Sequence, residues 1–318
     1  MASSSPTLLK EQQAFWSQHV HDTQMIFEIN SNPHVSWKAT RYPMFENMSL
    51  YEFKHRMLGA EVDESVLLKS NDDSQKLHVE SGMSEMDKRA ILRLPQEFDS
   101  RKQWPSCVHP IRDQQQCGSC WAFSASEVLS DRYCIATNGS VNVVLSPEFL
   151  VECSAQNNGC NGGKLDATWL FLVKIGIPTD QCVPYTSGNG VVGACPKTGC
   201  TSNPNEKLVL YKASHARRIV GAENIMIDIA AKGPVQAAMA VYRDFMSYKS
   251  GVYHHVSGGL VGGHAIKIVG WGVDSESRKP YWICANSWGP SWGIDGFFWI
   301  LRGVEECGIG RDVWTGYV

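Results

Sequence analysis

A cysteine near the middle of the chain has the surroundings expected of a nucleophile. Cys120 closes the run Cys117-Gly118-Ser119-Cys120, and Trp121 and the helically spaced residues 123–129 follow it. A helix is therefore predicted to begin at Cys120, where unpaired N–H groups and the helix dipole favour a thiolate. Without this context, the Cys-x-x-Cys spacing would also suit a redox pair or half of a zinc site.

A histidine and an asparagine lie far downstream and could act with this thiol. His264 stands in the run Gly-Gly-His-Ala-Ile, and Asn286 opens the run Asn-Ser-Trp-Gly. An imidazolium beside the thiol would lower the thiol pKa and protonate a leaving amine, while Asn286 would accept from the other ring N–H. The order and local sequences of these three residues resemble the papain family of cysteine proteases.

The resemblance implies an oxyanion site built from two donors. Gln114, six residues before Cys120, matches the glutamine of the family. Its side-chain amide and the backbone N–H of Cys120 would hold the oxyanion, and losing one such donor typically costs ~3 kcal/mol of transition-state stabilisation. One departure affects the loop geometry, because Gln115 stands where the family usually has glycine.

The same resemblance implies four substrate-side positions. Trp288 is expected to shield the histidine–asparagine contact from water and to border the substrate. Gly162 and Gly163 would leave a bare backbone edge on which an extended peptide can pair. Cathepsin B-type members carry an acid in the pocket for the substrate residue two before the scissile bond, and Asp312 takes that place. A carboxylate there would admit arginine, although Asp312 could instead form a surface pair with Arg311.

The chain divides near residue 93. Residues 1–93 are polar and helix-like and contain no cysteine, whereas residues 94–318 are rich in glycine, tryptophan and cysteine. Segments 37–59 and 94–105 resemble the short propeptide and the mature N-terminus of cathepsin B-type zymogens. Residues 1–93 are therefore expected to be an inhibitory propeptide and residues 94–318 a peptidase domain. The alternative is that residues 1–93 form an ordinary helical domain.

The resemblance also implies the fold class, which is α+β. A papain-like peptidase has a helical subdomain, expected at about 94–200, and a β-barrel-like subdomain, expected at about 201–318, with a cleft between them. Strand-like alternation in 264–271, 281–285 and 296–301 agrees with the second subdomain.

Composition excludes several other functions. The 318 residues include 29 basic and 32 acidic side chains, so a nucleic-acid partner is not expected. No stretch approaches the ~18 apolar residues needed to span a bilayer. The chain contains one Cys-x-x-Cys motif, whereas a structural zinc site would need paired motifs, so no cofactor or metal is expected. A monomer acting on peptides and proteins is expected.

The eleven cysteines all fall between Cys107 and Cys307, which favours disulfides and an oxidising compartment. The first residues lack the apolar run of a signal peptide, so the signal is expected to be missing from this sequence and the protein to be endolysosomal or secreted. The resemblance implies four pairs and leaves Cys284 and Cys307 as buried thiols. The pairs are Cys107–Cys134, Cys117–Cys160, Cys153–Cys195 and Cys182–Cys200.

Residues 183–194 are the main departure from cathepsin B-type enzymes. Those enzymes carry a long loop with a His-His pair here, which binds the substrate C-terminus and makes them carboxydipeptidases. This segment is short, glycine-rich and without histidine, so an open cleft and endopeptidase activity are expected. A carboxydipeptidase and a catalytically inactive binding protein remain the alternatives.

Three further motifs complete the sequence analysis. Asn47-Met48-Ser49 and Asn138-Gly139-Ser140 match the pattern for N-glycosylation, which predicts glycans on Asn47 and Asn138. The His254-His255 pair is assigned no role.

Overall fold

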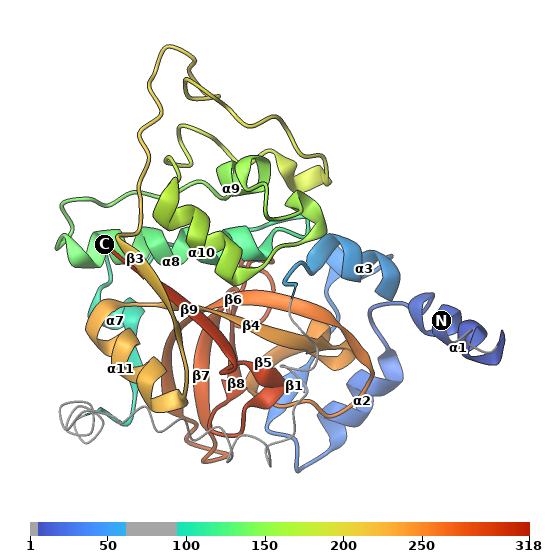
Figure 1. The fold of residues 1–318 in the computed structure, drawn as a ribbon. Coiled ribbons are helices and arrows are strands. Elements are labelled where there is room, and N and C mark those ends of the chain that lie inside the picture. The colour runs from blue at the N-terminus through green and yellow to red at the C-terminus, as the bar shows by residue number, and fades with distance from the viewer. Residues whose placement is uncertain (1–5, 62–93) are drawn as a thin grey trace.

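The computed structural model describes residues 6–61 and 94–318. A helical layer packs against a large sheet, and residues 6–61 lie alongside both (Figure 1). The helical layer consists of α8 (Cys120–Ala136), α9 (Pro147–Cys153) and α10 (Leu165–Lys174). Because α9, α10 and the sheet surround it, α8 is buried on nearly every face, as its mostly apolar sequence requires.

The sheet runs in the order β1-β5-β8-β7-β6-β4-β9-β3, and β2 also pairs with β6. Neighbouring strands are antiparallel except β5 and β8, which are parallel. The strands are β1 (Trp37–Ala39), β2 (Phe98–Asp99), β3 (His215–Ile219), β4 (Val235–Tyr242), β5 (Tyr248–Tyr253), β6 (Leu260–Val273), β7 (Pro280–Ala285), β8 (Phe297–Leu301) and β9 (Asp312–Tyr317).

Further helices lie around the helical layer and the sheet. The α-helices are α1 (Pro6–Trp16), α2 (Thr23–Ser31), α3 (Leu50–Met57), α7 (Ser100–Gln103) and α11 (Ala222–Lys232). The 3-10 helices are η1 (Pro43–Phe45), η2 (Gly159–Asn161), η3 (Ser187–Asn189), η4 (Arg243–Ser247) and η5 (Glu306–Gly308). No helix among the described residues is long and apolar enough to cross a membrane.

Residues 6–61 dock onto the sheet through one shared apolar core. Strand β1 pairs with β5, and Trp37 packs 5.1 Å from the ring of Tyr253. Phe45 and Phe53 pack edge-on against Trp288, with ring centroids 5.8 and 5.3 Å apart. All of these side chains are buried. The first segment is thus continuous with the core of residues 94–318.

The helical layer and the sheet exchange short segments. Strand β2 belongs to the sheet and not to the helical part, because Phe98 pairs with Trp271 of β6. Ala213 is buried in the core of the helical layer, against which Leu208 and Tyr211 also pack. Residues 98–99, which precede the helical layer in the chain, thus join the sheet, and residues 208–213, which precede β3, join the helical layer.

All four predicted disulfides are present. They join Cys107 to Cys134, Cys117 to Cys160, Cys153 to Cys195 and Cys182 to Cys200. Of the remaining cysteines, Cys120 and Cys284 are buried, but Cys307 is only partly buried, which corrects the expectation of a buried thiol.

Candidate active site

The thiol of Cys120 lies where α8 meets the central strand β6. The helix begins at Cys120 as predicted, and the backbone N–H of Ala265 on β6 donates to Cys120 Sγ at 3.4 Å. His264, the preceding residue of β6, contacts Asn286 through Nε2 and Oδ1 at 2.7 Å. Its Nδ1 has no hydrogen-bond partner within the described parts of the chain. Nδ1 is therefore the ring nitrogen available to a thiol.

Both groups are uncharged in this state. Burial raises the pKa of Cys120 to about 12, although backbone N–H groups of Ala265, Gly59, Trp121 and Cys120 itself act against it. Burial also lowers the pKa of His264 to about 4, and the hydrogen bond to Asn286 offsets only part of the shift. The thiolate expected from the helix N-terminus is thus not favoured while the site is covered.

Trp288 covers the histidine–asparagine contact. Its ring lies 4.7 Å from the ring of His264 and is fully buried. Asn286 Oδ1 also accepts from the backbone N–H of Ser287 at 2.8 Å, which fixes the orientation of the side chain. Asn286 therefore orients the ring of His264, and Trp288 shields their contact from water.

Gln114 lies beside Cys120 with its amide held in one orientation. Ser287 Oγ donates to Gln114 Oε1 at 2.6 Å, so the Nε2 group must face the other way. Nε2 donates to the carbonyl oxygens of Cys117 at 2.8 Å and of Met57 at 3.0 Å. Sequence reasoning missed Ser287, although its place in the Asn-Ser-Trp run next to the ring partner was a usable signal.

The glutamine that replaces the family glycine adopts a glycine-like backbone. Gln115 has φ 54°, in the left-handed region that costs a residue with a side chain about 1 kcal/mol. Its backbone N–H donates to Asp113 Oδ1 at 2.7 Å, which helps to hold this conformation.

Residues 57–61 lie across these groups. Leu58 and Ala60 are buried, and Ala60 packs with Cys120, Leu165, Ala238 and Ala265. The Ala60 N–H donates to the carbonyl of Gly263 at 3.2 Å. The segment therefore excludes water from the catalytic candidates.

The glycine edge predicted for substrate pairing is occupied by the same segment. Gly163 N–H donates to Gly59 O at 2.8 Å, and Glu61 N–H donates to Gly163 O at 2.9 Å, which makes a parallel bridge. A Cβ on Gly162 would lie 3.0 Å from Gly59 O, so this edge also needs its bare backbone. The predicted edge exists and carries an extended chain.

Asp312 lies at the start of β9, next to the apolar group around Ala60. It accepts from Trp314 Nε1 at 2.8 Å and lies 3.6 Å from Arg218 Nε. Burial raises its pKa, and Trp314 and Arg218 act against the rise. Its ion-pair partner is Arg218 instead of the neighbouring Arg311 considered above.

The short segment 183–194 is anchored to α9. Glu148 accepts from the backbone N–H groups of Thr186 and Ser187, each at 3.2 Å, and from their hydroxyls at 3.0 and 2.7 Å. Burial, with Glu148 nearby, raises the pKa of Glu152 on the same helix to about 7. Glu148 therefore holds residues 186 and 187 against α9.

The His254-His255 pair has structural roles that the sequence analysis did not assign. His254 O accepts from Trp37 Nε1 at 3.0 Å, so it anchors strand β1. His255 Nδ1 lies 3.2 Å from Asp244 Oδ1. The potential glycosylation residues Asn47 and Asn138 are both exposed.

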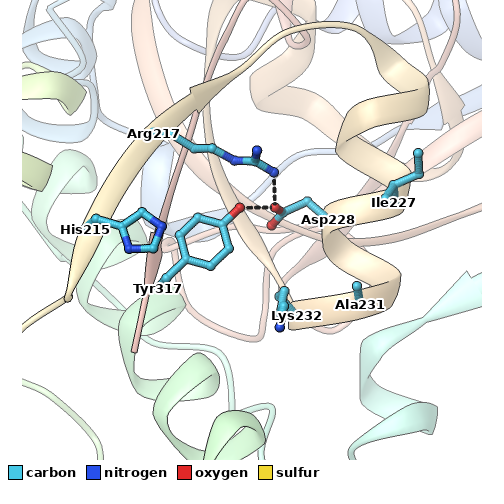
Figure 2. A pocket seen from close by; sticks show the side chains of 7 residues that line it. All are labelled: His215, Arg217, Ile227, Asp228, Ala231, Lys232 and Tyr317. Atoms are coloured by element: carbon cyan, nitrogen blue, oxygen red, sulfur yellow. Dashed lines mark hydrogen bonds and ion pairs between the residues drawn. The ribbon is translucent and has the colours of Figure 1, made fainter. Parts of the chain in front are cut away.

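A separate pocket of about 320 Å³ lies between β3, α11 and the end of β9 (Figure 2). It contains none of the predicted site residues. Figure 2 shows Arg217 and Tyr317 converging on Asp228, which also pairs with Arg132 of α8. These partners occupy the carboxylate, so the cluster ties α11 to α8. Among the described residues, no group of His, Cys, Asp or Glu is arranged to hold a metal ion.

The fold and this arrangement of a cysteine, a histidine and an asparagine define a thiol hydrolase. The sequence profile of the papain family of cysteine proteases matches residues 94–317, and the chain belongs to that family. It is a cysteine protease of the cathepsin B-like kind, which confirms the resemblance found in the sequence.

Known relatives support this grouping. "Cathepsin B-like CP3" of Giardia intestinalis is 44% identical over 230 residues, covering 72% of this chain and 76% of the relative. "Cathepsin B-like cysteine proteinase" of Schistosoma japonicum is 36% identical over 326 residues, covering 93% and 90%. Among solved structures, "proCathepsin B S9 from Trypanosoma congolense" is 33% identical with a TM-score of 0.81, covering 94% of this chain and 98% of that chain. The similarity to a proform extends over the first segment as well as the protease domain.

Proposed function

We propose that this chain is the zymogen of an endopeptidase in which Cys120 is the nucleophile and residues 1–93 are the inhibitor. The observation that carries this is the position of residues 57–61. The carbonyl oxygen of Met57 accepts from the Gln114 side-chain amide, and the backbone of Gly59 and Glu61 pairs with Gly163. A substrate would need both places.

The reaction follows from these groups once residues 57–61 have left. Cys120 loses its proton to His264 Nδ1, and the thiolate attacks the substrate carbonyl carbon. The resulting oxyanion takes donors from Gln114 Nε2 and the Cys120 N–H. His264 then gives its proton to the leaving amine, and water hydrolyses the thioester to regenerate the thiol. Asn286 keeps the ring in place throughout.

Acid is proposed to weaken docking of the inhibitor, and His21 offers a physical basis. His21 Nε2 accepts from Tyr42 N–H at 2.8 Å, so the neutral ring carries its proton on Nδ1, which faces Ser247 Oγ at 3.1 Å. Burial lowers the pKa of His21; the backbone of Tyr42 opposes this, Arg41 adds to it and Glu46 opposes it.

The sign follows from linkage. The pKa of His21 is lower in the docked segment than the value of about 6.5 expected after release. Docking of the segment is therefore strongest above pH 6.5. As the pH falls below it, the released segment binds a proton that the docked one does not. Docking weakens by up to about 1.4 kcal/mol per pH unit until the docked pKa is reached.

Substrate preference is proposed to include arginine two residues before the scissile bond. Ala60 lies in an apolar group with Leu165 and Ala238, and Asp312, with Arg218 as its partner cation, is paired with Ala238 between β9 and β4. Asp312→Ala should lower kcat/KM for arginine relative to phenylalanine at that position by about 10-fold, since one charge-assisted pair is lost. An unchanged ratio would remove Asp312 from the pocket.

Endopeptidase and carboxydipeptidase activity can be separated with matched peptides. One peptide carries a blocked C-terminus, and the other has the same sequence with a free carboxylate. Residues 183–194 contain no cationic side chain to bind a carboxylate, so the mature enzyme should cut both at the same internal bond. Predominant release of C-terminal dipeptides from the free form would favour the carboxydipeptidase.

A catalytically inactive binding protein is the remaining alternative. A peptidyl thiol-directed reagent distinguishes it, because such a reagent requires a nucleophilic Cys120 in an assembled site. Stoichiometric labelling at Cys120 after removal of residues 1–93, together with peptide hydrolysis, would exclude the binding-protein alternative. We also propose a monomer in an endolysosomal or secreted location, for which the four disulfides are the support.

A further inference from the structure

The hydroxyl of Tyr185 bridges the two ends of the loop that carries both proposed oxyanion donors. Tyr185 OH donates to the backbone carbonyl of Gln114 at 2.8 Å. It also lies 3.0 Å from Ser119 Oγ. Gln114 carries one donor, and Ser119 directly precedes Cys120, whose N–H is the other. A single phenol therefore contacts the residue that bears one donor and the residue next to the other.

The direction of these hydrogen bonds is fixed by chemistry. A carbonyl oxygen can only accept, so the single proton of Tyr185 points to Gln114. Ser119 Oγ is then the donor in its 3.0 Å contact with Tyr185, and the carbonyl oxygen of Cys117, at 3.4 Å, is a second and more distant acceptor for its proton. Burial raises the pKa of Tyr185 far above its usual range, so the phenol keeps this proton throughout the working range of the enzyme.

This contact has a consequence for the N-terminus of α8. Serine at an N-cap commonly accepts from the N–H groups of the first helical turn. Ser119 makes no such bond, because its hydroxyl is turned to Tyr185. The Ala122 N–H bonds to the Ser119 carbonyl oxygen instead, so the N–H that this orientation of the hydroxyl leaves for the thiol is that of Trp121.

We propose that Tyr185 is a positioning residue for the oxyanion site, acting through Gln114, and that Ser119 orients the Tyr185 hydroxyl. The inference rests on the proposed function, since it assumes the oxyanion role of Gln114. Tyr185 lies within the short segment 183–194, and Glu148 holds the residues that directly follow it. Residues 183–194, which differ from the corresponding loop of cathepsin B-type enzymes, would thus support catalysis by holding the backbone of Gln114.

The main test is Tyr185→Phe, alone and combined with Gln114→Ala, in the mature enzyme after titration of active sites with a peptidyl thiol reagent. Removing a whole oxyanion donor costs about 10²- to 10³-fold in kcat. A displaced donor should cost less, so we expect Tyr185→Phe to lower kcat about 10-fold with KM unchanged. In the Gln114→Ala background, Tyr185→Phe should change kcat less than 2-fold.

Tyr133→Phe is the matched control. Tyr133 OH donates to Lys212 O at 2.6 Å and accepts from Lys212 N–H at 3.0 Å, so it loses the same kinds of bond. It touches none of the proposed catalytic groups and should keep wild-type kcat. Thermal unfolding of both variants measures how much the loss of each hydroxyl lowers the stability of the protein. Ser119→Ala supplies a second test if Tyr185→Phe fails to fold, with a fall in kcat that is lost in the Gln114→Ala background.

Each outcome has one interpretation. Loss of kcat in Tyr185→Phe that disappears without Gln114 supports the positioning role. An equal loss in both backgrounds, or a loss no greater than in Tyr133→Phe, overturns it. Wild-type kcat in Gln114→Ala alone would instead overturn the oxyanion part of the proposed function, whatever Tyr185 does.

Discussion

Gly59 lies directly against the backbone of Gly118, which leaves no room there for a side chain. A Cβ on Gly59 would lie 1.9 Å from the carbonyl oxygen of Gly118 and 2.5 Å from its carbon. Both atoms belong to backbone beside the disulfide at Cys117, so they have little freedom to move. The methyl group of Gly59→Ala can be accommodated only if residues 58–61 shift outward by about 1 Å.

That shift breaks the hydrogen bonds by which the segment is held. They are Gly163 N–H to Gly59 O at 2.8 Å, Glu61 N–H to Gly163 O at 2.9 Å and Ala60 N–H to Gly263 O at 3.2 Å. At about 1 kcal/mol each, their loss weakens docking of the segment by about 3 kcal/mol. The fraction of zymogen with an uncovered Cys120 should rise roughly 100-fold.

The assay is the rate at which a peptidyl thiol reagent labels Cys120 in the intact zymogen at neutral pH. Intact-chain mass separates labelled zymogen from any processed enzyme, and peptide mapping assigns the label to Cys120. Glu28→Ala is the control, because Glu28 is exposed and its hydrogen bond, to Gln24, stays within α2. If Gly59→Ala zymogen labels no faster than wild type, residues 58–61 do not gate the site as argued.

Four further predictions concern catalysis, release of the first segment by acid, and glycosylation. Cys120→Ala should give a folded zymogen that neither processes itself nor cleaves peptides, whereas Asn286→Ala should keep partial activity because it only orients the ring; hydrolysis by purified Cys120→Ala would refute the first. His21→Gln keeps hydrogen-bonding groups but cannot gain a proton in this range, so the pH midpoint for zymogen labelling should fall, and an unmoved midpoint would exclude His21 as the sensor. Glycans on Asn47 and Asn138 should appear as a mass shift, lost on enzymatic deglycosylation, in the secreted protein.

The sequence predicted the catalytic half of the site better than the inhibitory half. The Cys-Gly-Ser-Cys-Trp run specifies a helix start, and the Asn-Ser-Trp run places Asn286 and Trp288 together, so short local patterns sufficed. Residues 37–39 lie in a segment expected to be helix-like but form strand β1 instead, because three residues with one alternation carry almost no signal and their partner β5 lies about two hundred positions away. Tertiary contacts supply that strand.

Buried charges were equally invisible in the sequence. Lys267 follows His264 on β6 and pairs with Asp131 of α8 at 2.8 Å, with Glu127 at 3.5 Å. Asp131 Oδ1 also lies 2.7 Å from His109 Nδ1. Each residue type is ordinary on a surface, and only the packing of α8 against β6 brings them together. This group helps to hold α8 against the strand that carries His264.

The state of the catalytic pair explains how one displacement can switch on the whole site. Burial is the largest cause of the raised pKa of Cys120 and of the lowered pKa of His264. Residues 57–61 contribute to the burial of Cys120, because Ala60 packs with it and the Gly59 N–H lies against its thiol, whereas the N–H groups of α8 belong to residues 94–318 and stay. When the segment leaves, water returns, the main cause of both shifts is removed, and the thiolate–imidazolium pair can form. The same movement frees the Gln114 donor from the Met57 carbonyl. In the proposed function, substrate access and the charge of the nucleophile are therefore both controlled by residues 57–61.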